Sequence, residues 1–186
     1  MIDHHTDMLQ VLSVLLHYPD EDLQNGLDEI ESFAANLLPQ ETKAAVQVFI
    51  GDLKTQPLIR AQERYTALFD MDPAMTLNIT YHAFGDNEKR AAALAYLQHT
   101  YAQAGWERVT GELPDYLPLM LEFLSVCSHP GHAEPVWHCL QGLPPLVARL
   151  EKEAPVYAAL LQPIVTMAMA RCATEDGRDH PPEAIA

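Results

Sequence analysis

The sequence predicts an all-α protein that folds as a single globular domain of about seven or eight helices. Apolar residues recur at spacings of three and four along most of the chain, and no stretch alternates polar and apolar residues as a half-buried strand does. Proline or glycine ends most of these periodic runs. With 186 residues, 48% of them hydrophobic, the chain is long enough for one sizeable core, and no change in composition indicates a second domain.

The first half of the chain predicts four amphipathic helices. A first helix over 6–18 ends at Pro19, and Asp20 is placed to cap a second helix that runs to Pro39. A third helix follows, and a fourth begins at Pro57.

The segment 70–85 breaks the helical period and is the longest irregular stretch of this half. Long ordered loops are often functional, so the segment is a candidate for a binding role. Asp86 or Asn87 then caps a fifth helix, which stops at Gly105.

The second half is organised around a helix predicted over 112–129, with Pro114 at its first turn. A run over 133–153 follows and is kinked or divided near Pro144, and a last helix starts near Pro155. We therefore predict a helical domain over 1–173. The remaining residues, 174–186, are polar and have little to bury, so we expect a disordered tail.

Charge and composition exclude several classes of protein. With 26 acidic and 11 basic residues the net charge is -15, which repels a phosphate backbone and favours a basic partner; we expect no nucleic acid binding. The amino terminus lacks a secretory signal, and no apolar run reaches the length of a membrane span, so we expect a cytoplasmic protein without membrane insertion. Three cysteines in no framework spacing suit reduced thiols.

The predicted helix 112–129 carries one polar stripe on an otherwise apolar surface. At 100° per residue, Asp115, Glu122 and His129 fall on the same narrow face. One interpretation is that Glu112 and Asp115 only stabilise the positive end of the helix dipole. The other is that Asp115 and Glu122 line an acidic-walled apolar groove for a basic partner.

No motif for nucleotide binding, metalloprotease, redox or hydrolase chemistry is present, and we expect no catalytic residue and no enzyme. A zinc site is conceivable where cysteines and histidines gather, but their spacing favours core cysteines and loop histidines, so no metal site is predicted. The residues concerned are Cys127, His129, His132, His138 and Cys139.

The irregular segment offers further hydrogen-bonding side chains near a helix start: Tyr81, His82, Asp86 and Arg90. A solvated loop and a partner-binding surface both fit these residue types. The histidine would make binding at this position sensitive to pH.

Three segments occur in this order: YTALFD at 65–70, LNITYHAFGDNEKR at 77–90 and ELPDYLPLMLEFL at 112–124. Together they resemble the assembly chaperones of respiratory nitrate reductase, a family also called its delta subunit. The resemblance runs from Leu12 to about Met169. The wider family comprises all-helical chaperones of molybdenum oxidoreductases, whose Glu-x-Pro-Asp-His pattern matches Glu112, Pro114 and Asp115, with Tyr116 in place of the histidine.

The resemblance implies a chaperone that binds the amino-terminal segment of the nitrate reductase catalytic (alpha) subunit, and we expect the chaperone to be a monomer. The chaperone would keep the apoenzyme competent for insertion of molybdopterin guanine dinucleotide, would bind no cofactor stably itself, and would be absent from the finished enzyme. The client segment would lay its apolar face in a helical groove while its cations meet acidic side chains. The partner-binding residues expected are Tyr81, His82, Asp86, Arg90, Glu112, Pro114, Asp115, Tyr116 and Glu122.

Two other functions stay open at this stage. A helical adaptor would remain in the redox enzyme complex and use the acidic stripe as its interface. A metal carrier would bind zinc or molybdenum in isolation.

Overall fold

The computed structural model describes residues 4–107 and 111–176. Within these ranges the chain forms ten α-helices and no β-strand, which confirms the predicted all-α fold and slightly exceeds the predicted number of helices. The helices are α1 (His4–Leu15), α2 (Glu21–Leu37), α3 (Gln40–Lys54), α4 (Leu58–Tyr65), α5 (Ile79–Phe84), α6 (Glu88–Gln103), α7 (Leu117–Val126), α8 (Pro130–Leu140), α9 (Pro144–Glu153) and α10 (Pro155–Asp176). A π-turn, η1 (Thr66–Asp70), and a 3₁₀ turn, η2 (Pro73–Met75), follow α4.

Two helix starts follow the caps that the sequence supplies. The Asp20 carboxylate accepts a hydrogen bond from the backbone N–H of Leu23 (2.8 Å) at the start of α2. The Asn87 side chain accepts from the N–H groups of Lys89 (2.8 Å) and Arg90 (3.2 Å) at the start of α6. Of the two candidate caps for α6, the structure therefore selects Asn87.

The prediction was wrong at the start of one helix and missed another, short helix. The helix expected from Pro114 begins instead at Leu117, because the backbone of Tyr116 is extended (φ -67°, ψ 120°) and Pro118 occupies the first turn. The segment 70–85, expected to be irregular, contains η2 and the six-residue helix α5. A helix this short shows too few turns for its period to stand out in the sequence.

The later helices differ from expectation in smaller ways. The predicted division near Pro144 separates α8 from α9. The last helix continues through Pro163 to Asp176, three residues into the predicted tail. Residues 177–186 lie outside the described ranges.

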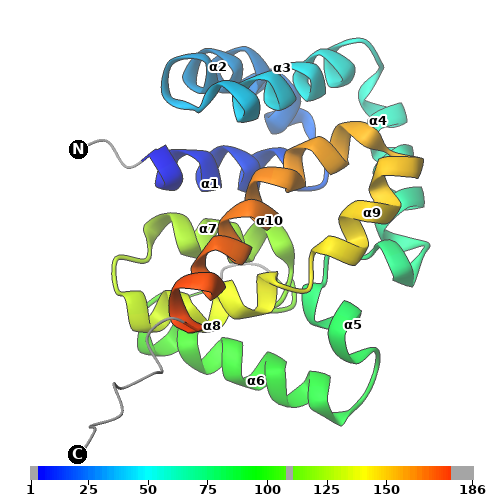
Figure 1. The fold of residues 1–186 in the computed structure, drawn as a ribbon. Coiled ribbons are helices and arrows are strands. Elements are labelled where there is room, and N and C mark those ends of the chain that lie inside the picture. The colour runs from blue at the N-terminus through cyan, green and yellow to red at the C-terminus, as the bar shows by residue number, and fades with distance from the viewer. Residues whose placement is uncertain (1–3, 108–110, 177–186) are drawn as a thin grey trace, which may run out of the picture.

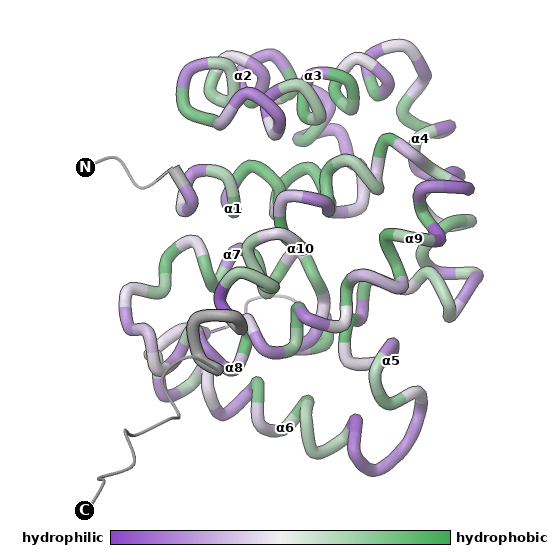
Figure 2. Tube along the Cα trace, viewed as in Figure 1, coloured by the Kyte–Doolittle hydropathy of each residue, from purple (hydrophilic) through white to green (hydrophobic). Residues whose placement is uncertain are grey.

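The helices pack in layers around α1 and α10 (Figure 1). α1 packs against α2 on one side and α7 on the other, while α10 contacts α3, α8 and α9. The tube in Figure 2 is hydrophobic along much of α1, in keeping with its central position. A chain of edge-on aromatic rings, Tyr65, Phe69, Tyr157 and Phe49, crosses this core.

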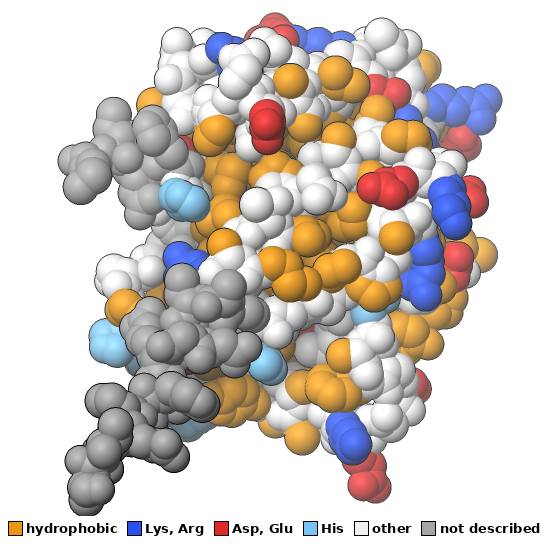
Figure 3. Space-filling model, viewed as in Figure 1, with side chains coloured by type: hydrophobic (Ala, Val, Ile, Leu, Met, Phe, Trp, Pro, Cys, Tyr) orange, Lys and Arg blue, Asp and Glu red, His pale blue; other side chains and the backbone are white. Residues whose placement is uncertain are grey.

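On the face drawn in Figure 3, hydrophobic side chains gather across the middle and charged side chains lie mostly toward the edges. None of the helices within the described ranges has the length and apolar character needed to cross a membrane.

Candidate functional site

Two segments that are far apart in the sequence meet directly before α5 and α7. The backbone N–H of Leu117 donates to the carbonyl of Leu77 (2.8 Å), and the N–H of Ile79 donates to the carbonyl of Asp115 (2.9 Å). These bonds belong to a short antiparallel bridge. The bridge joins the second and third of the sequence segments quoted above.

The side chain of Asp115 lies inside this junction and is 0% exposed. Its Oδ2 accepts hydrogen bonds from the backbone N–H (3.2 Å) and the hydroxyl (2.5 Å) of Thr80, the second residue of α5. Nη2 of Arg90, on α6, lies 3.6 Å from the same oxygen. Asp115 therefore ties α5 and α6 to the start of α7.

The predicted stripe that pairs Asp115 with Glu122 is not formed, and this is a correction. Because α7 starts at Leu117, Asp115 precedes the helix and turns inward, whereas Glu122 is on the helix and exposed. Asp115 therefore does not line a groove. Pro114 is also buried, and its carbonyl accepts a hydrogen bond from the Tyr101 hydroxyl (2.8 Å).

The four polar residues of the second segment separate into an inner group and an exposed one. The Arg90 guanidinium lies over the Tyr81 ring, 5.4 Å from its centroid, beside the buried Asp115. Nε2 of His82 is hydrogen-bonded to the carbonyl of Thr76 (2.8 Å), and burial lowers the pKa of His82. Asp86 is exposed in the turn before α6. Tyr81, His82 and Arg90 thus pack beside the junction, and none of the four residues lines the groove described next.

Tyr116 lies at the opposite side of the junction, toward α1. Its hydroxyl is 2.8 Å from the hydroxyl of Tyr65, which donates to the carbonyl of Leu16 (3.0 Å). The ring of Tyr116 meets the ring of His17 edge-on, with centroids 5.7 Å apart. Tyr116 is thus fixed by contacts to α4 and to the end of α1.

Three adjoining hollows, which share lining residues, form one groove beside α1, and we call it the α1–α2 groove. The outer hollow, about 190 Å³, lies between α1 and α2 and is lined by Gln10, Val11, Val14, Glu29, Ile30 and Phe33. The middle hollow, about 510 Å³, is lined by Val14, His17, Tyr18, Asp20, Asp22, Leu23, Ile30, Glu112 and Tyr116. The inner hollow, about 230 Å³, is lined by Tyr18, Tyr65, Phe69, Asp70, Thr76, Leu77, Asn78, Glu112 and Tyr116.

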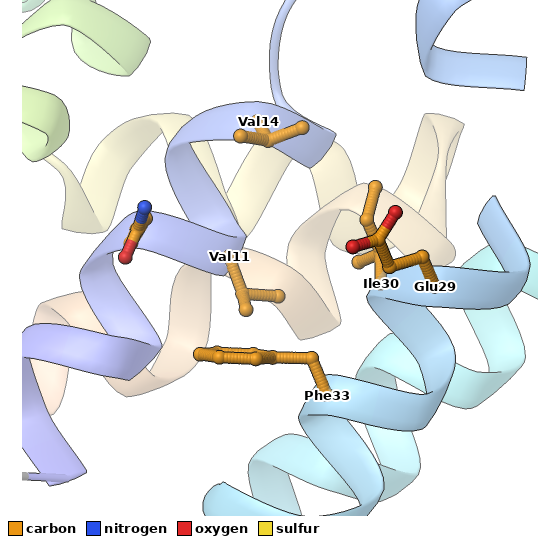
Figure 4. A pocket seen from close by; sticks show the side chains of 6 residues that line it. Val11, Val14, Glu29, Ile30 and Phe33 are labelled. Atoms are coloured by element: carbon orange, nitrogen blue, oxygen red, sulfur yellow. The ribbon is translucent and has the colours of Figure 1, made fainter. Parts of the chain in front are cut away.

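The outer end of the groove has apolar walls (Figure 4). Val11 and Val14 project from α1, and Phe33 and Ile30 project from α2. Val14 is 40% exposed and Phe33 is 38% exposed, although both belong to helices that pack against each other. Apolar side chains left open in a hollow of this kind are typical of a site for a protein segment.

The rim of the groove is acidic. Five carboxylates line it, those of Asp20, Asp22, Glu29, Asp70 and Glu112, and among the described residues no lysine or arginine does. Burial lowers the pKa of His17, while the nearby carboxylates of Glu122, Glu112 and Asp20 oppose that shift. Glu122 therefore adds negative charge beside the middle hollow.

Of the residues expected to bind a partner, Glu112 and Tyr116 line the α1–α2 groove and Glu122 lies near it. Most of the other lining residues come from α1, α2 and the connection between them, none of which was among the expected partner-binding residues. Ile30 and Phe33 have the helical spacing that is typical of the apolar stripe of an amphipathic helix. Helical periodicity identifies such a stripe but does not show whether another element covers it.

Within 4–107 and 111–176, no group of three or more His, Cys, Asp and Glu side chains is arranged to hold a metal ion. Cys139 is half-buried, and burial raises the pKa of its thiol to about 11. Such a thiol stays protonated and is a poor ligand. The side chain of Cys172 lies outside the described residues.

Comparison with known proteins agrees with the resemblance seen in the sequence. Residues 19–136 match the family model described as "Nitrate reductase delta subunit". The chain is 33% identical to the nitrate reductase molybdenum cofactor assembly chaperone NarJ of Escherichia coli (strain K12), over 95% of this chain and 79% of that protein. It is 31% identical to the probable chaperone of the same description in Bacillus subtilis (strain 168), over 81% of this chain and 82% of that protein.

A solved structure has the same fold. The crystal structure of a putative redox enzyme maturation protein from Archaeoglobus fulgidus superposes with a TM-score of 0.63 over 88% of this chain and 93% of that one, at 21% sequence identity. The sequence relatives are named as assembly chaperones and not as catalysts, which agrees with the expectation that the chain is not an enzyme. The chain belongs to the nitrate reductase delta subunit family, whose relatives include molybdenum cofactor assembly chaperones.

Proposed function

We propose that this protein is a nitrate reductase assembly chaperone that holds the amino-terminal segment of the catalytic subunit in the α1–α2 groove. While the segment is held, the apoenzyme stays open for insertion of its molybdenum cofactor. The protein acts as a monomer in the cytoplasm and is absent from the finished enzyme. The observation that carries this proposal is a continuous groove with apolar walls and a rim of carboxylates.

The groove suits an amphipathic, basic segment. Its apolar face would bury the open side chains of Val14, Ile30 and Phe33, at roughly 25 cal/mol for each Å² removed from water. Cationic side chains of the segment would lie along the acidic rim. Because the rim is exposed, these charges contribute more to orientation and association rate than to affinity.

The acidic groove favours a role in cofactor insertion that acts through the client, and disfavours direct binding of the cofactor by this protein. Molybdopterin guanine dinucleotide carries phosphate groups, and the groove presents carboxylates and, among the described residues, no lysine or arginine. Once the client has folded around its cofactor, the segment docks on its own protein, and this competition releases the chaperone by mass action.

The test is a calorimetric titration with a synthetic peptide that covers the amino terminus of the nitrate reductase catalytic subunit. We expect saturable one-to-one binding that is weaker at about 500 mM than at about 20 mM salt, because salt screens the rim charges. Val14→Ser should weaken binding about tenfold by making the groove wall polar. Val48→Ser is the matched control, because Val48 is 61% exposed on α3 and lines none of the three hollows.

Equal losses for the two valine variants would contradict the location of the site. No binding by the wild-type protein at either salt concentration would contradict the proposed function. Stoichiometric retention of the protein in purified, mature nitrate reductase would identify a permanent adaptor and not a chaperone.

A further inference from the structure

The inner hollow of the α1–α2 groove differs from the outer one in its chemistry. Aromatic rings form much of its wall, and its remaining lining is mostly polar: Asp70, Thr76, Asn78 and Glu112. Tyr65 and Phe69 are 3% and 4% exposed, so the rings at its base are held firmly by the core. A hollow with aromatic walls and acidic groups suits a flat cation.

The direction of the hydrogen bonds at the base can be worked out. The Tyr65 hydroxyl has one hydrogen and donates it to the Leu16 carbonyl, which only accepts (3.0 Å). The 2.8 Å contact between the two tyrosine hydroxyls must then be a bond donated by Tyr116 to Tyr65. With its hydrogen used, the Tyr116 oxygen offers only lone pairs to any other group. It is therefore an acceptor for a ligand in the hollow.

The raised pKa values of the two tyrosines keep both hydroxyls protonated, and so keep this arrangement in place, at neutral pH. Burial raises the pKa of Tyr116 to about 12, and the negative charges of Glu112 and Asp70 act in the same direction. Burial also raises the pKa of Tyr65 well above its usual range. Both hydroxyls keep their hydrogens, and both carboxylates act on the Tyr116 hydroxyl.

The π-turn η1 brings Asp70 to the edge of the hollow. The N–H of Met71 donates to the carbonyl of Thr66 (3.1 Å), which closes a turn one residue wider than that of an α-helix. This turn buries Phe69 in the core and leaves Asp70 exposed beside it, so an aromatic ring and a carboxylate line the hollow side by side. π-Turns are rare and occur often at functional sites.

We propose that the inner hollow binds the guanidinium group of an arginine in the client segment, with the Tyr116 oxygen and the Asp70 carboxylate as acceptors. This proposal rests on the proposed function. Guanidinium is favoured over ammonium because it is planar, lies flat on aromatic rings and donates in several directions within one plane. Among the described residues, the hollow is lined by no cationic side chain that would compete for these acceptors.

The first test uses small probes, so it does not depend on the client. N-acetyl-arginine methylamide is titrated into protein with isotope-labelled tyrosines, followed by NMR, beside the neutral isostere N-acetyl-citrulline methylamide. We expect the arginine probe to shift the ring signals of Tyr116 and Tyr65 and to bind about tenfold more tightly than citrulline, because only arginine makes charge-assisted bonds. Equal binding of the two probes, or shifts confined to tyrosines outside the inner hollow, would overturn the proposal.

The second test asks whether the client uses this site. Each arginine of the amino-terminal peptide is replaced in turn by citrulline, and each peptide is titrated against wild type, Tyr116→Phe and Asp70→Asn. We expect one replacement to weaken wild-type binding about tenfold and to have much less effect in either variant, which is the signature of direct coupling. Tyr96→Phe, on α6 and 58% exposed, is the control and should behave as wild type.

The outcomes separate the two proposals. The arginine site would be overturned if every citrulline replacement weakened binding to the same extent in wild type and in both variants. The proposed groove function would stand if the unmodified peptide still bound. Selective binding of the arginine probe without any binding of the peptide would overturn the proposed function and the client as the source of the arginine, and would leave a guanidinium site in the inner hollow. Asp70 is exposed, so Asp70→Asn is expected to fold normally even if Tyr116→Phe is destabilised, and thermal melting of each variant verifies this.

Discussion

At the scale of single residues, Asp115 is the clearest case of a polar side chain whose role is set by burial. Its carboxylate bonds to Thr80 and lies 3.6 Å from the Arg90 guanidinium, with no exposure to solvent. Removing one member of a buried charged pair leaves the other without compensation. The segment 112–124, one of the three that carry the family resemblance, thus holds the scaffold together through Asp115 and lines the groove through Glu112 and Tyr116.

We expect Asp115→Ala to lower the free energy of unfolding by about 3 kcal/mol, because the variant strands Arg90 and the hydroxyl of Thr80. Urea denaturation followed by circular dichroism measures the change. Glu122→Ala is the matched control on the exposed side of α7 and should change stability by less than about 0.5 kcal/mol. Similar values for the two variants would mean that the buried network contributes nothing.

The half-buried side chain of His82 gives a pH dependence of known sign. Burial is the main cause that lowers its pKa in the folded protein, so the unfolded chain binds a proton more readily than the folded one. Its contribution to stability is complete above the unfolded pKa of about 6.5 and is lost as pH falls through the lower, folded value. We expect the free energy of unfolding to fall between about pH 7 and 5, and less steeply in His82→Gln. An identical slope in the variant would contradict this assignment.

At the scale of elements, the helix ends show what local sequence determines. Asp20 and Asn87 cap α2 and α6 as their residue types predict, because an N-cap bond joins groups only two or three residues apart. The start of α7 was mispredicted because the backbone at Tyr116 pairs with a segment that precedes it by about forty residues. A contact over that separation leaves no periodic signal in a single sequence.

The connection between α5 and α6 depends on a glycine conformation. Gly85 has φ 62° and ψ -151°, a region that is essentially restricted to glycine. We expect Gly85→Ala to cost roughly 1 to 3 kcal/mol, although no atom lies within 4 Å of the added methyl group. Gly51→Ala, in the interior of α3 and equally free of contacts, should instead stabilise the protein by up to about 1 kcal/mol. Thermal denaturation compares the two, and equal effects would rule out a conformational cause.

The groove could be predicted in its chemistry but not in its position. The excess of acidic residues indicated a basic partner, and Glu112 and Tyr116 were among the candidates. Val14, Ile30 and Phe33 escaped notice because an apolar residue at helical spacing looks the same whether or not a neighbour covers it. Their exposure depends on how α1 and α2 pack, which is a property of the whole fold.

At the scale of the whole molecule, the net charge of -15 and the acidic rim of the groove together produce a negative electrostatic field. Such a field steers a basic segment toward the protein and acts mainly on the association rate. We expect the association rate constant for the amino-terminal peptide to fall by about tenfold or more between about 20 and 500 mM salt, while the dissociation rate changes much less. Stopped-flow measurements give both rates. A salt effect confined to the dissociation rate would mean that the rim charges act within the bound complex and do not steer association.

Intermolecular NOEs on a methyl-labelled sample show whether the client segment lies in the α1–α2 groove. With the unlabelled amino-terminal peptide bound, we expect NOEs from its apolar side chains to the methyl groups of Val11, Val14 and Ile30. Val48 and Ile59, which are 61% and 58% exposed outside the groove, should show none. NOEs to those two residues, with none to the groove methyl groups, would show that the segment binds elsewhere on the protein.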